Sequence, residues 1–219
     1  MADDRSEGIW RRLALPVMHR FRSRRGQAIL ERFPDLGSMR VCDVGGSAHF
    51  WESIGLRPGE LDVYNIDVTE TAPATDDGPS IPIIIYDGEH IPVADGHYDL
   101  ALSNSVLEHV PPAQRQRFCD EMCRVGREVF LQTPNRGFPI EPHFVFPFIH
   151  WLPRSIGRHL VAITPWRILS RPDAATRRSY FDDTHLLSKA ELRRLFPMAE
   201  LRAEKVLGLT KSWYVTVRR

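Results

Sequence analysis

Acidic, amide and small side chains follow four short apolar runs in this chain, and these residue types suit the binding of a polar ligand. The runs end in turn at Gly45, Asp67, Asp87 and Asn104. Because the carboxyl ends of parallel strands meet at one edge of an open α/β sheet, we expect these positions to line a single crevice. Carboxylate and amide oxygens there could accept hydrogen bonds from the hydroxyl and amino groups of a nucleoside-like ligand.

The first of these runs, Val41–Val44, contains Asp43 and is followed by Gly45 and Gly46. Glycine lets the backbone bend sharply and approach a ligand closely. A buried strand that ends in such a turn is typical of the strand-to-helix junction that binds nucleotide cofactors.

Two histidines are candidate catalytic bases. His143 follows Glu141 by two residues, and His185 follows the pair Asp182–Asp183. Imidazole titrates near neutral pH, and a neighbouring carboxylate can fix its tautomer. A purely structural or surface role for each histidine remains open.

The elements that would position these residues can be predicted from hydrophobic pattern and turn residues. Runs rich in Val, Ile and Leu predict strands over residues 39–44, 62–66, 81–86, 98–103 and 128–132. Their nearly continuous apolarity is typical of parallel strands that are covered on both faces. Helices are predicted over 50–56, 112–124 and 188–196, the last with Ser188 and Glu191 at capping-box spacing.

We therefore predict an α/β fold: a Rossmann-like, doubly wound and mostly parallel sheet that ends in an antiparallel hairpin formed by residues 201–206 and 212–217. The 219 residues suffice for one such domain. Residues 1–37 are predicted to form a helical N-terminal cap on a domain of residues 38–219. Within that domain, 136–185 form an aromatic, proline-rich insertion on the substrate side, and 69–80 form a loop.

Composition excludes several classes of function. The formal net charge is +1, which gives no broad positive surface for nucleic acid. A local set of arginines is predicted to be the solvated face of the first helix, with contact to a lipid or a polyanion as the alternative: Arg11, Arg12, Arg20, Arg22, Arg24 and Arg25. The three cysteines form neither a disulfide framework nor a zinc or iron–sulfur spacing, so no metal is predicted and a cytoplasmic location is expected. Neither a signal peptide nor a membrane-spanning helix is indicated.

Four segments in series resemble the class I S-adenosylmethionine-dependent methyltransferases, in their small-domain, ubiquinone-biosynthesis-like form. The segments are VCDVGGS at 41–47, YNID at 64–67, DGEHIP at 87–92 and YDLALSNSVLEHV at 98–110. The resemblance is strong over residues 38–135. It implies S-adenosylmethionine as cofactor and S-adenosylhomocysteine as product.

The resemblance also implies which residues contact the cofactor: Asp43, Gly45, Gly46, Ser47, Asp67, Val68, Asp87, Gly88, Asn104 and Ser105. The first turn would hold the methionine part, Asp67 the ribose hydroxyls, and Asp87 the adenine amino edge. Asn104 would contact the methionine amine. Ser47 and His49 depart from the family pattern, because they stand where the family usually has further glycines.

The predicted activity is methyl transfer by in-line displacement to a small, partly hydrophobic acceptor. The aromatic stretch 138–151 suggests such an acceptor and leaves open contact with a lipid-like substrate or a membrane surface. Two alternatives remain open: an inactive S-adenosylmethionine-binding module that acts through a partner, and an NAD(P)-dependent oxidoreductase. The oxidoreductase is disfavoured by Ser47 and Phe50, because the dinucleotide-binding fingerprint requires glycine or alanine at these positions. No oligomeric state is predicted.

Overall fold

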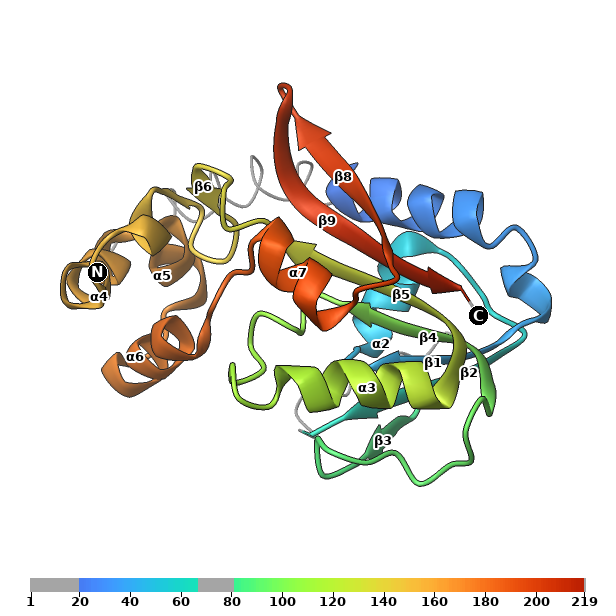
Figure 1. Cartoon of the computed structure of the whole chain (residues 1–219). Coiled ribbons are helices and arrows are strands. Elements are labelled where there is room, and N and C mark those ends of the chain that lie inside the picture. Colours follow the sequence, from blue (N-terminus) through green and yellow to red (C-terminus); the bar gives the residue numbers. More distant parts are fainter. Residues whose placement is uncertain (1–19, 67–80, 219) are drawn as a thin grey trace.

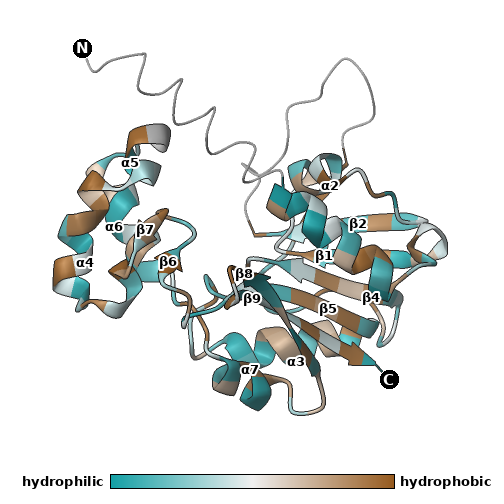
Figure 2. Ribbon diagram, turned by 90° about the horizontal axis from the view of Figure 1, so that it is seen from above, coloured by the Kyte–Doolittle hydropathy of each residue, from teal (hydrophilic) through white to brown (hydrophobic). Residues whose placement is uncertain are grey.

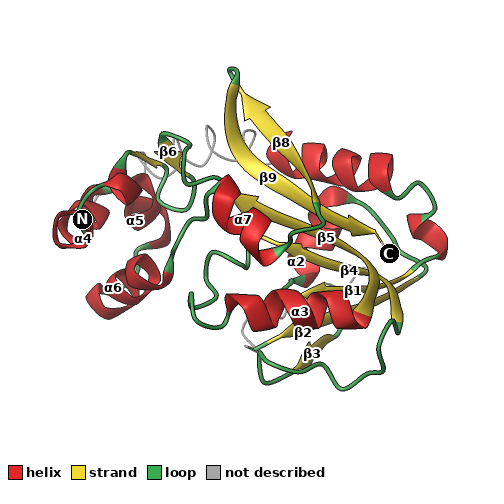
Figure 3. Ribbon diagram, in the orientation of Figure 1, coloured by secondary structure: helices red, strands yellow, loops and turns green. Residues whose placement is uncertain are grey.

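The computed structural model describes residues 20–66 and 81–218. Its centre is a seven-stranded sheet, drawn yellow in Figure 3. From one edge to the other, the strands are β3 (Ile83–Ile85), β2 (Glu60–Asn65), β1 (Arg40–Val44), β4 (Tyr98–Asn104), β5 (Gly126–Pro134), β9 (Leu209–Arg218) and β8 (Glu200–Val206).

The sheet combines parallel and antiparallel pairing. Strands β1 to β5 pair in parallel, whereas β9 pairs antiparallel with both β5 and β8. The middle of β4 is fully buried, as expected for a strand that is covered on both faces. The structure thus confirms the predicted Rossmann-like, mostly parallel sheet with a C-terminal antiparallel hairpin.

Helices cover both faces of the sheet (Figure 1). On one face, α3 (Arg115–Val125) and α7 (Lys189–Leu195) contribute Met122 and Leu192 to a core with the strands. On the other face, α2 (Ala48–Ile54) and the helix at residues 20–32 pack through Trp51 and Ile29. The capping box predicted at α7 is present, since Ser188 and Glu191 bond to each other's backbone N–H.

Two helix boundaries differ from the prediction. Helix α3 begins at Arg115 and not at Pro112, and α2 begins at Ala48 and not at Phe50. Glu108 and His109 lie in a turn before α3. The predicted loop at 69–80 lies outside the described residues.

Residues 136–185 form a small lobe beyond the carboxyl ends of the parallel strands (Figures 1 and 2). It contains the short hairpin β6 (Ile140–Glu141) and β7 (Phe146–Pro147), then helices α4 (Arg154–Leu160), α5 (Pro165–Ser170) and α6 (Ala174–Asp183). Phe144, Ile149, Val161 and Phe181 form a separate hydrophobic core in this lobe. These helices were not predicted, because the frequent prolines indicated a broken chain.

None of the helices in the described part of the chain combines the length and the apolar character that a membrane span requires.

Candidate active site

The turn after β1 has room for glycine only. Gly45 adopts a left-handed conformation with φ of 75°, and a Cβ atom there would lie 2.5 Å from Val106. A Cβ atom on Gly46 would lie 1.9 Å from the Asp43 carboxylate. Ser47 has an extended backbone with φ of −138°, which any residue can adopt, so this departure from the family pattern fits the turn.

Asp43 lies directly beneath this turn and is fully buried. Its Oδ2 accepts a hydrogen bond from the indole of Trp51 at 2.8 Å, whereas Oδ1 has no partner among the described residues. Burial raises the pKa of Asp43 to about 7, although the bond from Trp51 acts in the opposite direction. The unpaired oxygen is available to a cationic or hydrogen-donating ligand.

Asn65, at the end of β2, is a site residue that the sequence analysis did not single out. Its Nδ2 donates to the carbonyl of Gly46 at 2.8 Å, and its Oδ1 accepts from the N–H of Ile66. The side chain therefore ties the first turn to the second strand. Its place within the YNID segment was the available signal. Asp67 and Val68, which follow, lie outside the described residues.

Asp87 builds the third turn. Its Oδ1 accepts from the N–H groups of Glu89 and His90, each at 2.8 Å, and these bonds lower its pKa. Gly88 follows with a φ of 81°, a conformation that favours glycine. Oδ1 of Asp87 therefore already accepts two backbone hydrogen bonds within the turn.

The end of β4 bears Asn104 and Ser105. The Oδ1 of Asn104 accepts from Arg25 at 3.1 Å, so the predicted contact with an amine would compete with this bond. Ser105 has a φ of 56°, which is uncommon for a residue other than glycine, and its hydroxyl donates to Gln132 at 2.7 Å. Strained backbone of this kind persists where the surrounding structure holds it in place.

All the described residues that were predicted to bind the cofactor line one cavity of about 620 Å³, called here the first cavity: Asp43, Gly45, Gly46, Ser47, Asp87, Gly88, Asn104 and Ser105. The four turns therefore converge at one edge of the sheet, as expected from the strand order.

A second cavity of about 610 Å³ adjoins the first, because both are lined by Ser47, Phe50, Asn104 and Ser105. Its apolar lining comes mainly from the lobe and the N-terminal helix and includes Phe21, Phe138, Ile140, Pro142 and Val145. Its arginine and lysine lining consists of Arg22, Arg25 and Lys211, and no carboxylate of the described residues lines it.

The positions of the arginines correct the prediction that they form the solvated face of the first helix. Arg20 and Arg24 are exposed, as predicted for a solvated helix face. Arg22 and Arg25 instead turn toward the second cavity. Arg11 and Arg12 lie outside the described residues.

His143 lines the second cavity and lies within a cluster of ionisable groups. Its Nδ1 lies 2.7 Å from Glu141, and its Nε2 lies 3.3 Å from His109 and 3.6 Å from Glu108. Burial lowers the pKa of His143, but the two carboxylates outweigh this effect and raise it to about 10. Burial and the charge of His143 lower the pKa of His109.

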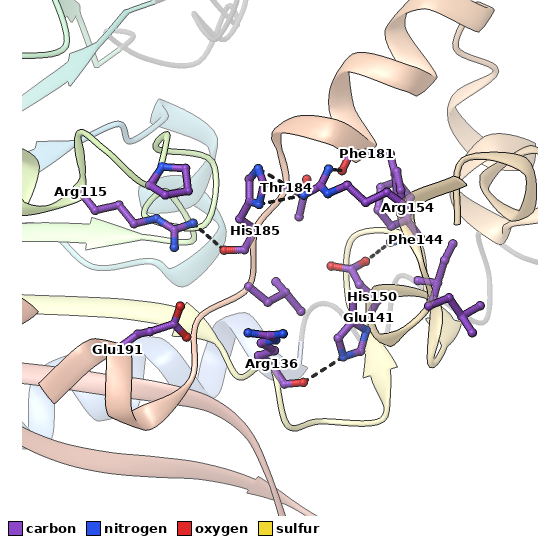
Figure 4. Close-up of a pocket in the computed structure, with 14 residues that line it drawn as sticks. Arg115, Arg136, Glu141, Phe144, His150, Arg154, Phe181, Thr184, His185 and Glu191 are labelled. Carbon is purple, nitrogen blue, oxygen red and sulfur yellow. Dashed lines mark hydrogen bonds between the residues drawn. The ribbon is translucent and has the colours of Figure 1, made fainter. Parts of the chain in front are cut away.

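His185, the other candidate base, lies elsewhere. It lines a third cavity of about 280 Å³ between the lobe and the main domain, and Arg154 lies 2.8 Å from its Nδ1 (Figure 4). Burial and the charge of Arg154 lower its pKa. The structure therefore does not bring the two candidate bases together, and only His143 borders a cavity that adjoins the predicted cofactor site.

The residues at the first cavity fit S-adenosylmethionine. The glycine turn allows close backbone approach, the unpaired Asp43 oxygen suits a cationic amine, and Gly88 adds no side chain to the cavity lining. The role of each residue in binding the cofactor stays a prediction.

Comparisons with known proteins point to the same class. Residues 42–128 match the family described as "Methyltransferase domain". A S-adenosylmethionine-dependent methyltransferase from Mesorhizobium loti superposes with a TM-score of 0.55 at 16% identity, over 88% of this chain and 96% of that one. Magnesium protoporphyrin IX methyltransferase from Synechocystis, with bound S-adenosylmethionine, gives 0.52 at 15% identity, over 92% and 80%.

A protein described as a putative zinc-dependent alcohol dehydrogenase from Rhodobacter sphaeroides also superposes, with a TM-score of 0.55 at 16% identity, over 90% of each chain. At such identities the likeness concerns the fold alone. No curated protein matches the chain.

The family match over residues 42–128 and the arrangement of the first cavity together show a S-adenosylmethionine-dependent methyltransferase domain in this chain. The predicted enzyme class and cofactor are thereby confirmed. Its assignment to the ubiquinone-biosynthesis-like form stays a prediction.

Proposed function

We propose that this enzyme transfers a methyl group from S-adenosylmethionine, bound in the first cavity, to a small and partly hydrophobic acceptor bound in the second. The observation that carries this proposal is that the two cavities adjoin at Asn104 and Ser105. An acceptor in the second cavity could therefore reach the cofactor without crossing the sheet.

The lining of the second cavity supports a particular kind of acceptor. Aromatic and aliphatic side chains favour an apolar body. Arg22, Arg25 and Lys211 favour an anionic group on the same molecule. Lys211 is partly neutralised by Glu204 at 3.2 Å, so Arg22 and Arg25 carry most of this preference.

The cofactor supplies an electrophilic methyl group on a sulfonium, and the protein mainly has to align the acceptor with it. Orientation of this kind can contribute roughly 7–11 kcal/mol to the lowering of a barrier. The rigid turns at Gly45 and Ser105 suit this task, because their backbone positions are fixed by strands β1 and β4.

The test combines binding with turnover. Calorimetry should detect binding of S-adenosylhomocysteine to the purified chain and no comparable binding of NAD. Mass spectrometry should then detect a gain of one methyl group on a member of an acceptor panel. The panel pairs free acids, such as hydroxylated fatty acids and phenolic acids, with their methyl esters.

The predicted preference is for the free acids. Arg22→Gln should raise KM for an acidic acceptor roughly tenfold, about 1.4 kcal/mol, and leave KM for its ester nearly unchanged. Equal effects on both would overturn the anionic preference. Cofactor binding without turnover across the panel would favour the alternative of an inactive binding module.

The lobe also supports contact with a lipid surface as the source of the acceptor. Phe148, Trp151 and Ile156 are each about half exposed, and the rings of Phe148 and Trp151 lie 5.2 Å apart. The enzyme should co-sediment with vesicles of neutral and anionic phospholipid, and the double variant Phe148→Ala, Trp151→Ala should do so less. Met198→Ala is the control, because Met198 is 91% exposed but belongs to the main domain.

A further inference from the structure

Glu108, His109 and His143 bring three metal-ligating atoms together at the edge of both large cavities. One atom from each residue, Glu108 Oε1 and the two imidazole nitrogens, lies within 4.8 Å of the others. His109 lines the first cavity, and His143 lines the second. The group therefore stands at the boundary between the predicted cofactor and acceptor sites.

Two of the three distances between these atoms match the spacing of ligands around one ion. Two ligands that bind zinc at about 2.0–2.2 Å in tetrahedral geometry lie roughly 3.3–3.6 Å apart. Nε2 of His143 lies 3.3 Å from Nε2 of His109 and 3.6 Å from Oε1 of Glu108. The ligand atoms of Glu108 and His109 lie within 4.8 Å of each other, so a single ion could bind all three atoms if these two side chains move closer together.

Glu108 provides a second observation, because one of its buried oxygens lies 3.6 Å from His143 Nε2 but accepts no hydrogen bond from the described part of the chain. The residue is fully buried, and its Oε1 has no hydrogen-bond partner among the described residues. Its Oε2 accepts from the hydroxyl of Thr133 at 2.9 Å, which fixes the direction of the carboxylate. A buried carboxylate oxygen without a hydrogen bond is costly unless a cation compensates for it.

The surrounding contacts would orient the two imidazoles for an ion. His143 Nδ1 is bound to Glu141 at 2.7 Å, so its Nε2 is the nitrogen that faces the cluster. The other oxygen of Glu141 accepts from the backbone N–H of Phe144 at 2.7 Å, a bond drawn in Figure 4. A carboxylate that holds the far nitrogen of a histidine ligand is a recurrent outer contact of metal sites.

His109 has corresponding support. The hydroxyl of Thr184 lies 3.5 Å from its Nδ1, and the ring of Tyr180 lies 5.5 Å from its ring, tilted by 31°. Its Nε2 therefore also faces the cluster.

We propose that Glu108, His109 and His143 form a binding site for one divalent cation of the zinc class, with Glu141 as the positioning residue of His143. Two nitrogen ligands favour zinc or a similar transition metal over magnesium, which prefers oxygen. Three protein ligands leave a coordination position for water or for an oxygen of the acceptor. The sequence analysis predicted no metal, because two of the ligands lie 34 residues apart and come from different structural units.

The competing explanation is a buried network in which a proton on one imidazole, rather than an ion, joins the two nitrogens. The two explanations differ in metal content. Tag-free protein should be incubated with zinc, passed through a desalting column and analysed by mass spectrometry for bound metal. We expect about one zinc per chain, and magnesium in equal excess should not displace it.

The zinc content of variants tests whether these residues bind the metal. Glu108→Gln, His109→Gln and His143→Gln should each lose stoichiometric zinc. Glu141→Gln should retain the site with roughly 10–100-fold lower affinity, because it removes only the outer contact. The control is His159→Gln, since His159 is exposed on α4 and should not alter zinc content. Cobalt should produce a visible absorption band in the native chain and not in His143→Gln.

Binding of S-adenosylhomocysteine, measured on the same variants, separates this proposal from the proposed function and reports whether each variant folds. Zinc content no higher than background in the native chain would overturn the metal site, even if the cofactor binds. Stoichiometric zinc in His109→Gln or His143→Gln that matches the native chain would overturn it equally. Zinc binding without cofactor binding would instead refute the methyltransferase proposal alone.

Discussion

Gly46 lies so close to the Asp43 carboxylate that residue 46 has no space for a side chain. Gly46→Ala should therefore push Asp43 and the turn apart, which would weaken binding of S-adenosylhomocysteine by at least roughly tenfold and lower the melting temperature. Calorimetry and thermal unfolding measure the two effects. Gly37→Ala is the matched control, because a Cβ atom at residue 37 would meet nothing within 4 Å. Equal affinities in the two variants would contradict this account of the turn.

The raised pKa of Asp43 predicts a particular pH dependence of stability. Its value is about 7 in the folded chain and 3.8 for the free group, so the folded chain holds a proton that the unfolded chain releases between these values. This contribution to the free energy of unfolding is present below about pH 4 and is lost as the pH rises to about 7. It amounts to on the order of 4 kcal/mol.

Other carboxylates with lowered pKa values, such as Glu121 and Glu191, act in the opposite direction. The measurement is therefore a comparison of chemical denaturation between the native chain and Asp43→Asn from pH 4 to pH 8. The variant should gain stability relative to the native chain as the pH rises. Parallel curves would show that Asp43 titrates normally.

At the residue scale, short motifs allowed several residues that line the first cavity to be predicted. Asp43, Gly45 and Asn104 could be placed there because they lie in or next to the end of an apolar run, within segments that resemble the family, and strand order brings such ends together. Asn65 and Gln132 could not, because their roles depend on contacts across neighbouring strands. The cluster at His143 was also beyond sequence reasoning, since its spacing depends on how the lobe folds back.

At the scale of elements, the N-terminal helix is attached to the sheet by a few buried side chains. Ile29 is 1% exposed and packs with Phe33 and Tyr214 in one core. Ile29→Ala should lower the free energy of unfolding by about 2–5 kcal/mol. Leu30→Ala is the control on the same helix, because Leu30 is 41% exposed, and it should change stability by less than about 1 kcal/mol. Urea denaturation followed by circular dichroism provides the comparison.

The strands and main helices were predictable because their patterns are local. Continuous apolar runs indicated the buried parallel strands, and the Ser188–Glu191 spacing indicated the start of α7. The helices of the lobe were not predicted, because frequent proline and aromatic residues obscure the hydrophobic periodicity of short helices. Thr164 and Asp173 cap α5 and α6, and these caps were the signals that could have found them.

At the scale of the whole molecule, the lobe and the main domain have separate hydrophobic cores, so each should be able to unfold independently of the other. Phe144 is 1% exposed and packs against Trp166, Tyr180 and Phe181. Phe144→Ala should destabilise the lobe by about 3–5 kcal/mol and reduce methyl transfer strongly. Binding of S-adenosylhomocysteine should change little, since the first cavity is lined mainly by the main domain.

Hydrogen exchange should show faster exchange within residues 140–183 and unchanged exchange in β1 and β4. Ile163→Ala, at a position of the lobe that is 63% exposed, should alter neither exchange nor activity. Loss of cofactor binding in Phe144→Ala would mean that the two parts fold as one cooperative unit.

The order of the sheet also has a consequence for biosynthesis. Strand β5 pairs with residues 212–218 of β9, so one side of a central, apolar strand has no neighbour until these residues have left the ribosome. Unpaired strand edges invite association with other chains. The nascent polypeptide should accordingly need protection by a chaperone until β9 is synthesised, and termination before residue 209 should yield aggregates rather than a shortened enzyme.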